Sequence, residues 1–335
     1  MSNQESPQKR VDIGGQAVME GVMMKGPDAI AVAVRRPNGT IVVKRDTYIP
    51  PSKKHKWMGY PFFRGIIGMG SMLSLGMRTL QTSSDMLGIM DEEPSKFEKW
   101  LSKKLGKGID KIVMFTAAAL AIVLSIGLFF VIPEIVGTLL RKVISSRVTV
   151  NLLSGVVRIL ILIGYMLFCA MVPDVRRTFQ YHGAEHKTVY CHENNLPLTP
   201  ENAQKFSTLH PRCGTTFLLI TFVLAILLYT VLGYNGTNYM LRLLSRLALL
   251  PVVAGISYEV LRGLAHANGK LVNALRWPGL MMQKLTTRQP DEKMLEVAIA
   301  AMNAALHGLP DGEKTQEGYT VVPKAPAADA EPVQA

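Results

Sequence analysis

Long apolar runs alternate with polar segments along the chain and predict helices that cross a membrane. No charged residue occurs from Ile112 to Pro133, and none occurs from Thr215 up to Arg242. Each run is longer than the roughly 18 apolar residues that indicate a membrane-spanning helix. The two runs therefore predict an integral membrane protein.

Two further runs are apolar except for isolated charges. Residues 147–173 enclose Arg158, and residues 243–261 enclose Arg246 and Glu259. One charge costs about 3 kcal/mol at the centre of a spanning helix and less near its end, so the apolar remainder of each run can offset it. The alternative is that these two runs form buried or half-inserted helices. We expect a mainly α, polytopic membrane protein with about four transmembrane helices, at 112–133, 147–173, 215–234 and 243–261.

The N-terminal segment, residues 1–60, has a β pattern instead. Two runs rich in Val and Ile flank Asn38-Gly39 within residues 29–49, and Asn-Gly is a strong signal for a β-hairpin turn. The Gly-rich stretch 12–28 lacks Rossmann or Walker spacing, so we interpret it as a buried strand with a tight turn rather than a phosphate-binding loop. We expect a small cytoplasmic region that contains a β-hairpin.

The remaining segments are amphipathic or polar. Residues 61–111 contain an uncharged part, Gly65–Met77, that is too short to span, so we expect an interfacial helix or one packed on the spans. Residues 262–308 predict a cytoplasmic helical region whose last helix starts at Asp291 and stops at Gly308. Residues 309–335 are rich in Ala, Pro and Glu, and we expect a disordered tail.

The positive charges indicate which side of the membrane each loop occupies. The net charge is +12, and 48% of the residues are hydrophobic. The stretch Lys96–Lys111 carries six lysines and the 174–214 loop carries five lysines and arginines, whereas the connection "YNGTNYM" after the third predicted span carries none. The positive-inside rule then places both termini and the 174–214 His/Cys loop in the cytoplasm.

Charge and cysteine content also limit the partners. We interpret the excess of basic residues as the signal that keeps loops on the cytoplasmic side of the membrane. We therefore expect membrane lipid and other membrane proteins as partners and no nucleic acid. The three cysteines are an odd and sparse set, so no disulfide framework follows.

The segment "YHGAEHKTVYCHE" at 181–193 carries the strongest chemical signal. His182, Glu185 and His186 spell H-x-x-E-H. On a helix, residues four apart share a face, so the two imidazoles can hold one zinc ion or another divalent metal. Glu185 can then accept a proton from water at the metal, which is the inverzincin arrangement.

A catalytic zinc needs a third protein ligand and one open position. The candidates are Cys191 and His192 further along the same segment, His210 and Cys213 in "HPRCG", and Glu259 in the last predicted span. Glu259 would instead be structural if it paired with Arg262. Four closed ligands would make a structural zinc site, and a polar network that caps helix ends would hold no metal.

Several stretches resemble the YqhQ family of bacterial membrane proteins. They are "GGQAVMEGVMMKGP", "YHGAEHKTVYCHE", "FSTLHPRCGTTFLL", "LPVVAGISYEVLR" and "PGLMMQKLTTRQPDEKMLEVAIAAM", in this order from about residue 11 to 307. The resemblance implies a multi-pass protein of the bacterial inner or plasma membrane, in a family of unknown function whose members are often described as predicted metal-dependent enzymes. It implies as functional candidates Glu20, His182, Glu185, His186, His210, Cys213 and Glu259.

Three functions remain open at this point. The first is a membrane metallohydrolase with Glu185 as its catalytic base, acting on peptide or lipid-linked substrates. The second is a membrane-protein assembly or quality-control factor without enzymatic activity, whose His/Cys cluster is structural. The third is a transporter with Arg158, Arg246 and Glu259 along its path, although the sequence shows no inverted repeat.

Overall fold

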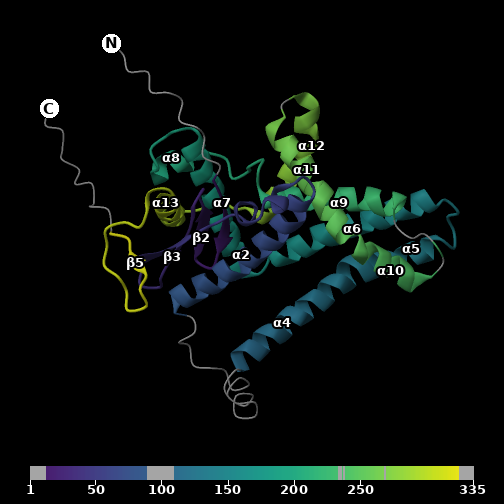
Figure 1. Cartoon of the computed structure of the whole chain (residues 1–335), viewed down its shortest axis with the longest axis horizontal. Coiled ribbons are helices and arrows are strands. Elements are labelled where there is room, and N and C mark those ends of the chain that lie inside the picture. The colour runs from purple at the N-terminus through teal and green to yellow at the C-terminus, as the bar shows by residue number, and fades with distance from the viewer. Residues whose placement is uncertain (1–12, 89–108, 233–235, 237, 268, 324–335) are drawn as a thin grey trace.

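A small antiparallel sheet lies at one end of a mainly helical molecule (Figure 1). The computed structural model describes residues 13–88, 109–232, 236, 238–267 and 269–323. The sheet has five strands in the order β1-β2-β3-β4-β5. They are β1 (Gly14–Val18), β2 (Gly21–Lys25), β3 (Ala29–Arg35), β4 (Ile41–Thr47) and β5 (Thr320–Val321).

Local sequence explains the first four strands. The predicted hairpin is confirmed, because β3 pairs with β4 across a turn in which Gly39 has a φ of +86°. Asn38 closes this turn, since its side-chain oxygen accepts a hydrogen bond from the backbone N–H of Thr40. Both faces of the sheet are covered: Met24 belongs to one apolar core and Met23 to the other. Strands covered on both faces read as nearly continuous apolar runs.

Helices from distant parts of the chain cover the two faces. On one face lie α7 (Pro173–Glu193), α8 (Pro200–Gln204) and α13 (Glu292–His307), and on the other lies α2 (Phe63–Leu87), which follows the short α1 (Pro51–Lys54) and η1 (Lys56–Gly59). The predicted bounds of the last helix are confirmed: Asp291 caps its N-terminus through the N–H of Met294, and Gly308 ends it with a φ of +105°.

The long apolar helices extend away from the sheet (Figure 1). They are α4 (Ile109–Ile126), the π-helical turn η3 (Gly127–Val131), α5 (Ile132–Leu140), α6 (Arg147–Cys169) and α9 (Gly214–Val231), followed by α10 (Tyr239–Ala248) and α11 (Leu250–His266). Within the described residues, three helices are long and apolar enough to cross a membrane, or up to four if α10 and α11 form one bent span. The next helix, α12 (Lys270–Thr286), packs against α9 and precedes α13.

Proline explains two differences from the predicted spans. The first helix does not end at Pro133 but continues to Leu140. Pro133 has no N–H to donate to the Phe129 carbonyl, yet Arg158 donates to that carbonyl from Nε at 2.8 Å, and the π-helical turn accommodates the break. The fourth predicted span is not straight, because α10 and α11 meet at 42° just before Pro251.

Other predicted boundaries also change. Residues 174–214 are not one loop, because α7 and α8 occupy most of them. The 309–335 segment is not wholly disordered, because Thr320–Val321 adds β5 to the edge of β4. The third span was expected to reach residue 234, but α9 ends at Val231. Parts of three predicted regions lie outside the described residues. They are residues 1–12 of the region 1–60, residues 89–108 of the region 61–111, and residues 324–335 of the segment 309–335.

Candidate functional site

Two histidines on α7 form the centre of the site. His182 and His186 lie one helical turn apart, and their ring centroids are 4.4 Å from each other. His186 is almost fully buried and His182 is half-buried. The spacing of four residues places both rings on one side of the helix, as the sequence predicted.

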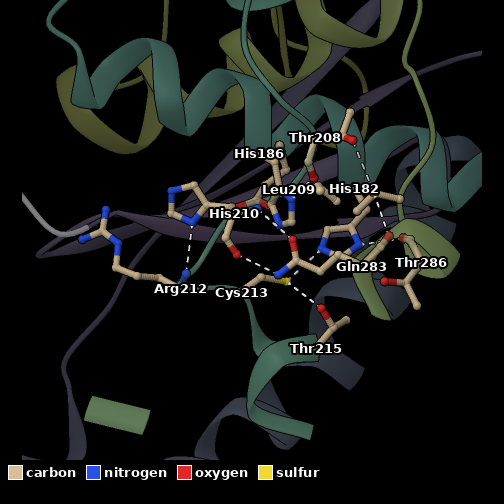
Figure 2. Close-up of polar contacts among 12 residues, drawn as sticks. His182, His186, Thr208, Leu209, His210, Arg212, Cys213, Thr215, Gln283 and Thr286 are labelled. Carbon is tan, nitrogen blue, oxygen red and sulfur yellow. Dashed lines mark hydrogen bonds and ion pairs between the residues drawn. The ribbon is translucent and has the colours of Figure 1, made fainter. Parts of the chain in front are cut away.

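Backbone carbonyls fix the orientation of both rings (Figure 2). The Nδ1 of His182 lies 2.9 Å from the carbonyl oxygen of Thr286, and the Nδ1 of His186 lies 2.5 Å from that of Thr208. A carbonyl can only accept, so each Nδ1 carries the proton and each Nε2 presents a lone pair. This is how metal-binding histidines are commonly held, with one nitrogen tied to a carbonyl and the other directed to the metal.

Cys213 completes a group of three possible metal ligands. Its Sγ lies 3.2 Å from the Nε2 of His182 and 3.3 Å from the Thr215 hydroxyl. Each of the three residues His182, His186 and Cys213 offers one ligand atom. These three atoms lie within 4.8 Å of one another. Cys213 directly precedes the first residue of α9, so the sulfur lies at the N-terminus of that helix.

Glu185 lies beside this group without a hydrogen-bond donor of its own. Its side chain is buried, and its Oε2 lies 3.4 Å from the Nε2 of His186. Among the residues that the structure describes, no N–H or O–H group donates to this carboxylate. The backbone of β1 runs close to it, since a Cβ on Gly15 would lie 2.8 Å from the Glu185 Cγ. A buried carboxylate without donors is costly unless a ligand, water or cation meets it.

His210 lies near the group, but its ring is not one of the three ligands. Its Nε2 lies 3.3 Å from an oxygen of Glu193 without forming a hydrogen bond, and Glu193 pairs with Arg212. Burial lowers the pKa of His210, so its ring stays neutral at neutral pH. The backbone of His210 is held by Gln283, which accepts from its N–H and donates to its carbonyl, each at 2.7 Å. This contact places the segment that leads to Cys213.

The other predicted candidates lie outside the three-ligand group. Glu259 accepts from Arg64 at 2.5 Å and from the N–H of Phe62. Glu20, in the β1–β2 turn with a φ of +49°, pairs with Arg177 and lies 3.4 Å from the Tyr181 hydroxyl.

The last two candidates are on the same helix as the histidines. The Cys191 thiol is buried, donates to the carbonyl of Pro197, and has its pKa raised by burial. His192 is partly buried, which lowers its pKa, and it is not among the three grouped ligands.

Sequence reasoning missed the residues that hold the site in shape. Gln283, Thr286 and Thr208 act through backbone contacts, for which the sequence carries no signal. Lys187 is buried next to His186 and donates to the carbonyls of Gln204 and Phe206. Its burial lowers its pKa, although lysine is among the residue types least often buried.

Gly183 lies on α7 between His182 and Glu185, and its lack of a side chain allows the backbone of Arg288 to lie close to the helix. A Cβ there would lie 2.1 Å from the Arg288 carbonyl oxygen. We therefore expect Gly183→Ala to lower stability by about 1–3 kcal/mol, although alanine normally favours a helix. Thermal unfolding of the purified protein measures the effect.

Gly164→Ala on α6 is the matched control. Nothing lies within 4 Å of a Cβ at Gly164, so the substitution should stabilise by up to about 1 kcal/mol. Equal shifts for the two variants would contradict the close contact at Gly183.

Comparison with known proteins identifies the family. Residues 60–308 match the family model described as "Protein of unknown function (DUF1385)". The chain belongs to the DUF1385 family. It is 35% identical over 299 residues to "Uncharacterized protein YqhQ" of Bacillus subtilis (strain 168), covering 88% of this chain and 92% of that protein. The resemblance to YqhQ is thereby confirmed. No solved structure matches this DUF1385 member.

Proposed function

We propose that this protein is a bacterial cell-membrane protein with a metal-dependent hydrolase site at the cytoplasmic membrane boundary. The apolar helix α9 supports the location, because it begins directly after Cys213 of the His/Cys group. The many basic residues before the first span and around α7 support a cytoplasmic position for the site and for both termini.

The observation that carries the proposal is the orientation of the two imidazoles. Both Nδ1 atoms are bound to backbone carbonyls, so both Nε2 lone pairs are available close to the Cys213 sulfur. Two imidazoles and one thiolate fit zinc, and three protein ligands match the number found in catalytic rather than structural zinc sites. A zinc ion bound there would supply a Lewis acid that lowers the pKa of a water molecule to about 7.

Glu185 is the proton acceptor in this proposal. Its Oε2 lies close to the Nε2 of His186, and no donor among the described residues occupies it. The carboxylate would take a proton from the attacking water and pass it to the leaving group of a peptide or lipid-linked substrate. His182, His186 and Cys213 would hold the metal, and Thr286 and Thr208 would orient the two rings.

Metal content tests the ligand set. We expect the purified wild-type protein to bind about one equivalent of zinc, as open three-ligand sites do. His186→Ala and Cys213→Ala should each reduce bound zinc by at least about ten-fold, because each removes a ligand directly. Elemental analysis after dialysis against a dilute zinc buffer measures the ratio of metal to protein.

His192→Ala is the control, because this residue is on α7 but outside the three-ligand group. It should keep the wild-type zinc content. Cobalt substitution gives a second readout, since the wild type and His192→Ala should show a sulfur-to-cobalt charge-transfer band and Cys213→Ala should not. Absence of zinc from the wild type, or equal zinc in all variants, would refute the proposed metal site.

One observation favours a second function, that of a membrane-protein assembly or quality-control factor. On α2 the side chains of Met69, Met72, Leu73 and Met77 are all exposed. Methionine-rich surfaces adapt to varied apolar partners, so this helix could hold segments of other membrane proteins. Substitution of Glu185 separates the two functions, because only the hydrolase requires its carboxylate.

A further inference from the structure

A mostly apolar cavity of about 390 Å³ lies between the long helices, and none of its lining residues belongs to the His/Cys group. α4, η3, α6, α9 and α11 all contribute to its wall. Most of its lining is aliphatic or aromatic and includes Ile122, Phe129, Phe222, Ala225 and Val253. Ligand pockets commonly have volumes of about 300–1,000 Å³ and are mainly apolar with a few placed polar groups.

Arg158 is the charged group of this cavity. Its side chain is only 5% exposed and lines the cavity wall. The Nε donates to the Phe129 carbonyl, and the guanidinium lies 5.5 Å from the ring of Phe130 and 5.4 Å from that of Tyr229. Within the described part of the chain, no carboxylate pairs with Arg158 and no hydrogen bond involves its two terminal amino groups.

The positive charge extends beyond Arg158. A smaller recess shares Arg158 with the cavity and reaches Arg246. Arg246 and Arg242 both pair with Glu134, and all three side chains are buried. Glu134 is therefore shared by two guanidinium groups, and Arg158 has no carboxylate partner among the described residues. Buried charges normally have a partner, so an anion is missing from the set.

The lining and the charge together define the ligand. Inorganic phosphate would satisfy Arg158 but would leave the apolar walls without an occupant, whereas a neutral lipid tail would fill the walls and leave the charge unpaired. We propose that the cavity binds an anionic lipid, with its acyl chain between α4, α6, α9 and α11 and its anionic group at Arg158. The headgroup would be a phosphate or a carboxylate, since a guanidinium pairs with either.

Selective lipid retention by the full-length protein tests the proposal. The protein is equilibrated with micelles that contain equimolar phosphatidylglycerol, phosphatidylcholine and palmitate, washed with lipid-free detergent, and analysed by native mass spectrometry. We expect the wild type to retain an anionic lipid over the zwitterionic phosphatidylcholine by about ten-fold, which corresponds to about 1.4 kcal/mol. Retained phosphatidylglycerol would identify a phospholipid and retained palmitate a free fatty acid.

Variants on two sides of the cavity make the test specific. Arg158→Gln should abolish the selectivity, and Arg158→Lys should keep part of it because the charge remains. Ser125→Trp should fill the cavity and exclude lipid while Arg158 is intact, whereas Leu124→Trp, at a neighbouring position that is 63% exposed, should not. Equal retention of anionic and zwitterionic lipids by the wild type, or unchanged selectivity in both Arg158→Gln and Ser125→Trp, would overturn the proposal.

Discussion

Glu185→Gln should reduce hydrolytic turnover by about 10²–10⁴-fold while leaving the bound zinc unchanged. Glutamine keeps the size of the side chain but cannot take a proton from water. Glu185 is outside the group of three possible ligands, so the metal should stay. Turnover is measured in proteoliposomes with a panel of fluorogenic peptide and ester substrates, and zinc is measured on the same samples.

Glu201→Gln on α8 is the control for this experiment, because Glu201 is exposed and lies outside the three-ligand group. It should match the wild type in turnover and in zinc. A bacterial strain that lacks the gene provides a second test in the cell. If Glu185→Gln restores that strain as fully as the wild type, the hydrolase is excluded and the assembly function gains support.

Glu134→Ala should produce the largest loss of stability, about 3–5 kcal/mol, because it leaves two guanidinium groups buried without their carboxylate. Glu134 pairs with Arg242 at 2.5 Å and also with Arg246, and it is 2% exposed. Removal of one partner from a buried ion cluster costs more than the cluster itself contributes. Thermal unfolding in detergent and the yield of folded protein both measure the effect.

Glu259→Ala provides the comparison. Glu259 pairs with Arg64, but these side chains are 30% and 25% exposed, so water can replace the lost contact. We expect a loss of about 1 kcal/mol or less. Equal losses for Glu134→Ala and Glu259→Ala would show that water reaches Glu134 as freely as it reaches Glu259.

Sequence patterns predicted correctly the features that depend on residues only a few positions apart in the chain. The spacing of His182 and His186 predicted that they share a face, because a helix fixes that relation over four residues. The Asn38-Gly39 turn and the Asp291 cap were predicted for the same reason, since each depends on groups only two or three residues away. Long apolar runs likewise predicted the long apolar helices.

Contacts between segments far apart in the chain determined the features that sequence patterns did not predict. Cys213 was one of five possible third ligands, and only the return of the chain at α9 places it beside His182. Glu259 was predicted as a ligand or as a partner of Arg262. Arg262 does interact with its charge, but the hydrogen-bonded partner is Arg64, 195 positions earlier in the chain. No local pattern encodes a partner at that distance.

The same reason explains the errors at helix and strand ends. The predicted first span ended at Pro133, before the charged Glu134, and Pro133 cannot donate to the preceding turn. The helix continues since Arg158 from α6 occupies the carbonyl left without a donor. β5 was missed because a strand of two residues has no pattern of its own, and it exists only through pairing with β4.

The sheet joins the beginning of the chain to its end, and this sets the order in which the protein can be completed. β1 is made early, whereas α13 and β5, which cover and extend the sheet, are made after every candidate span. The Thr286 carbonyl that orients His182 is 104 positions downstream of it. At 5–20 residues per second, ribosomes need roughly 5–20 s to cover that interval. The nascent chain therefore places its apolar helices first, and the His/Cys group acquires its final geometry only in the last stage of synthesis.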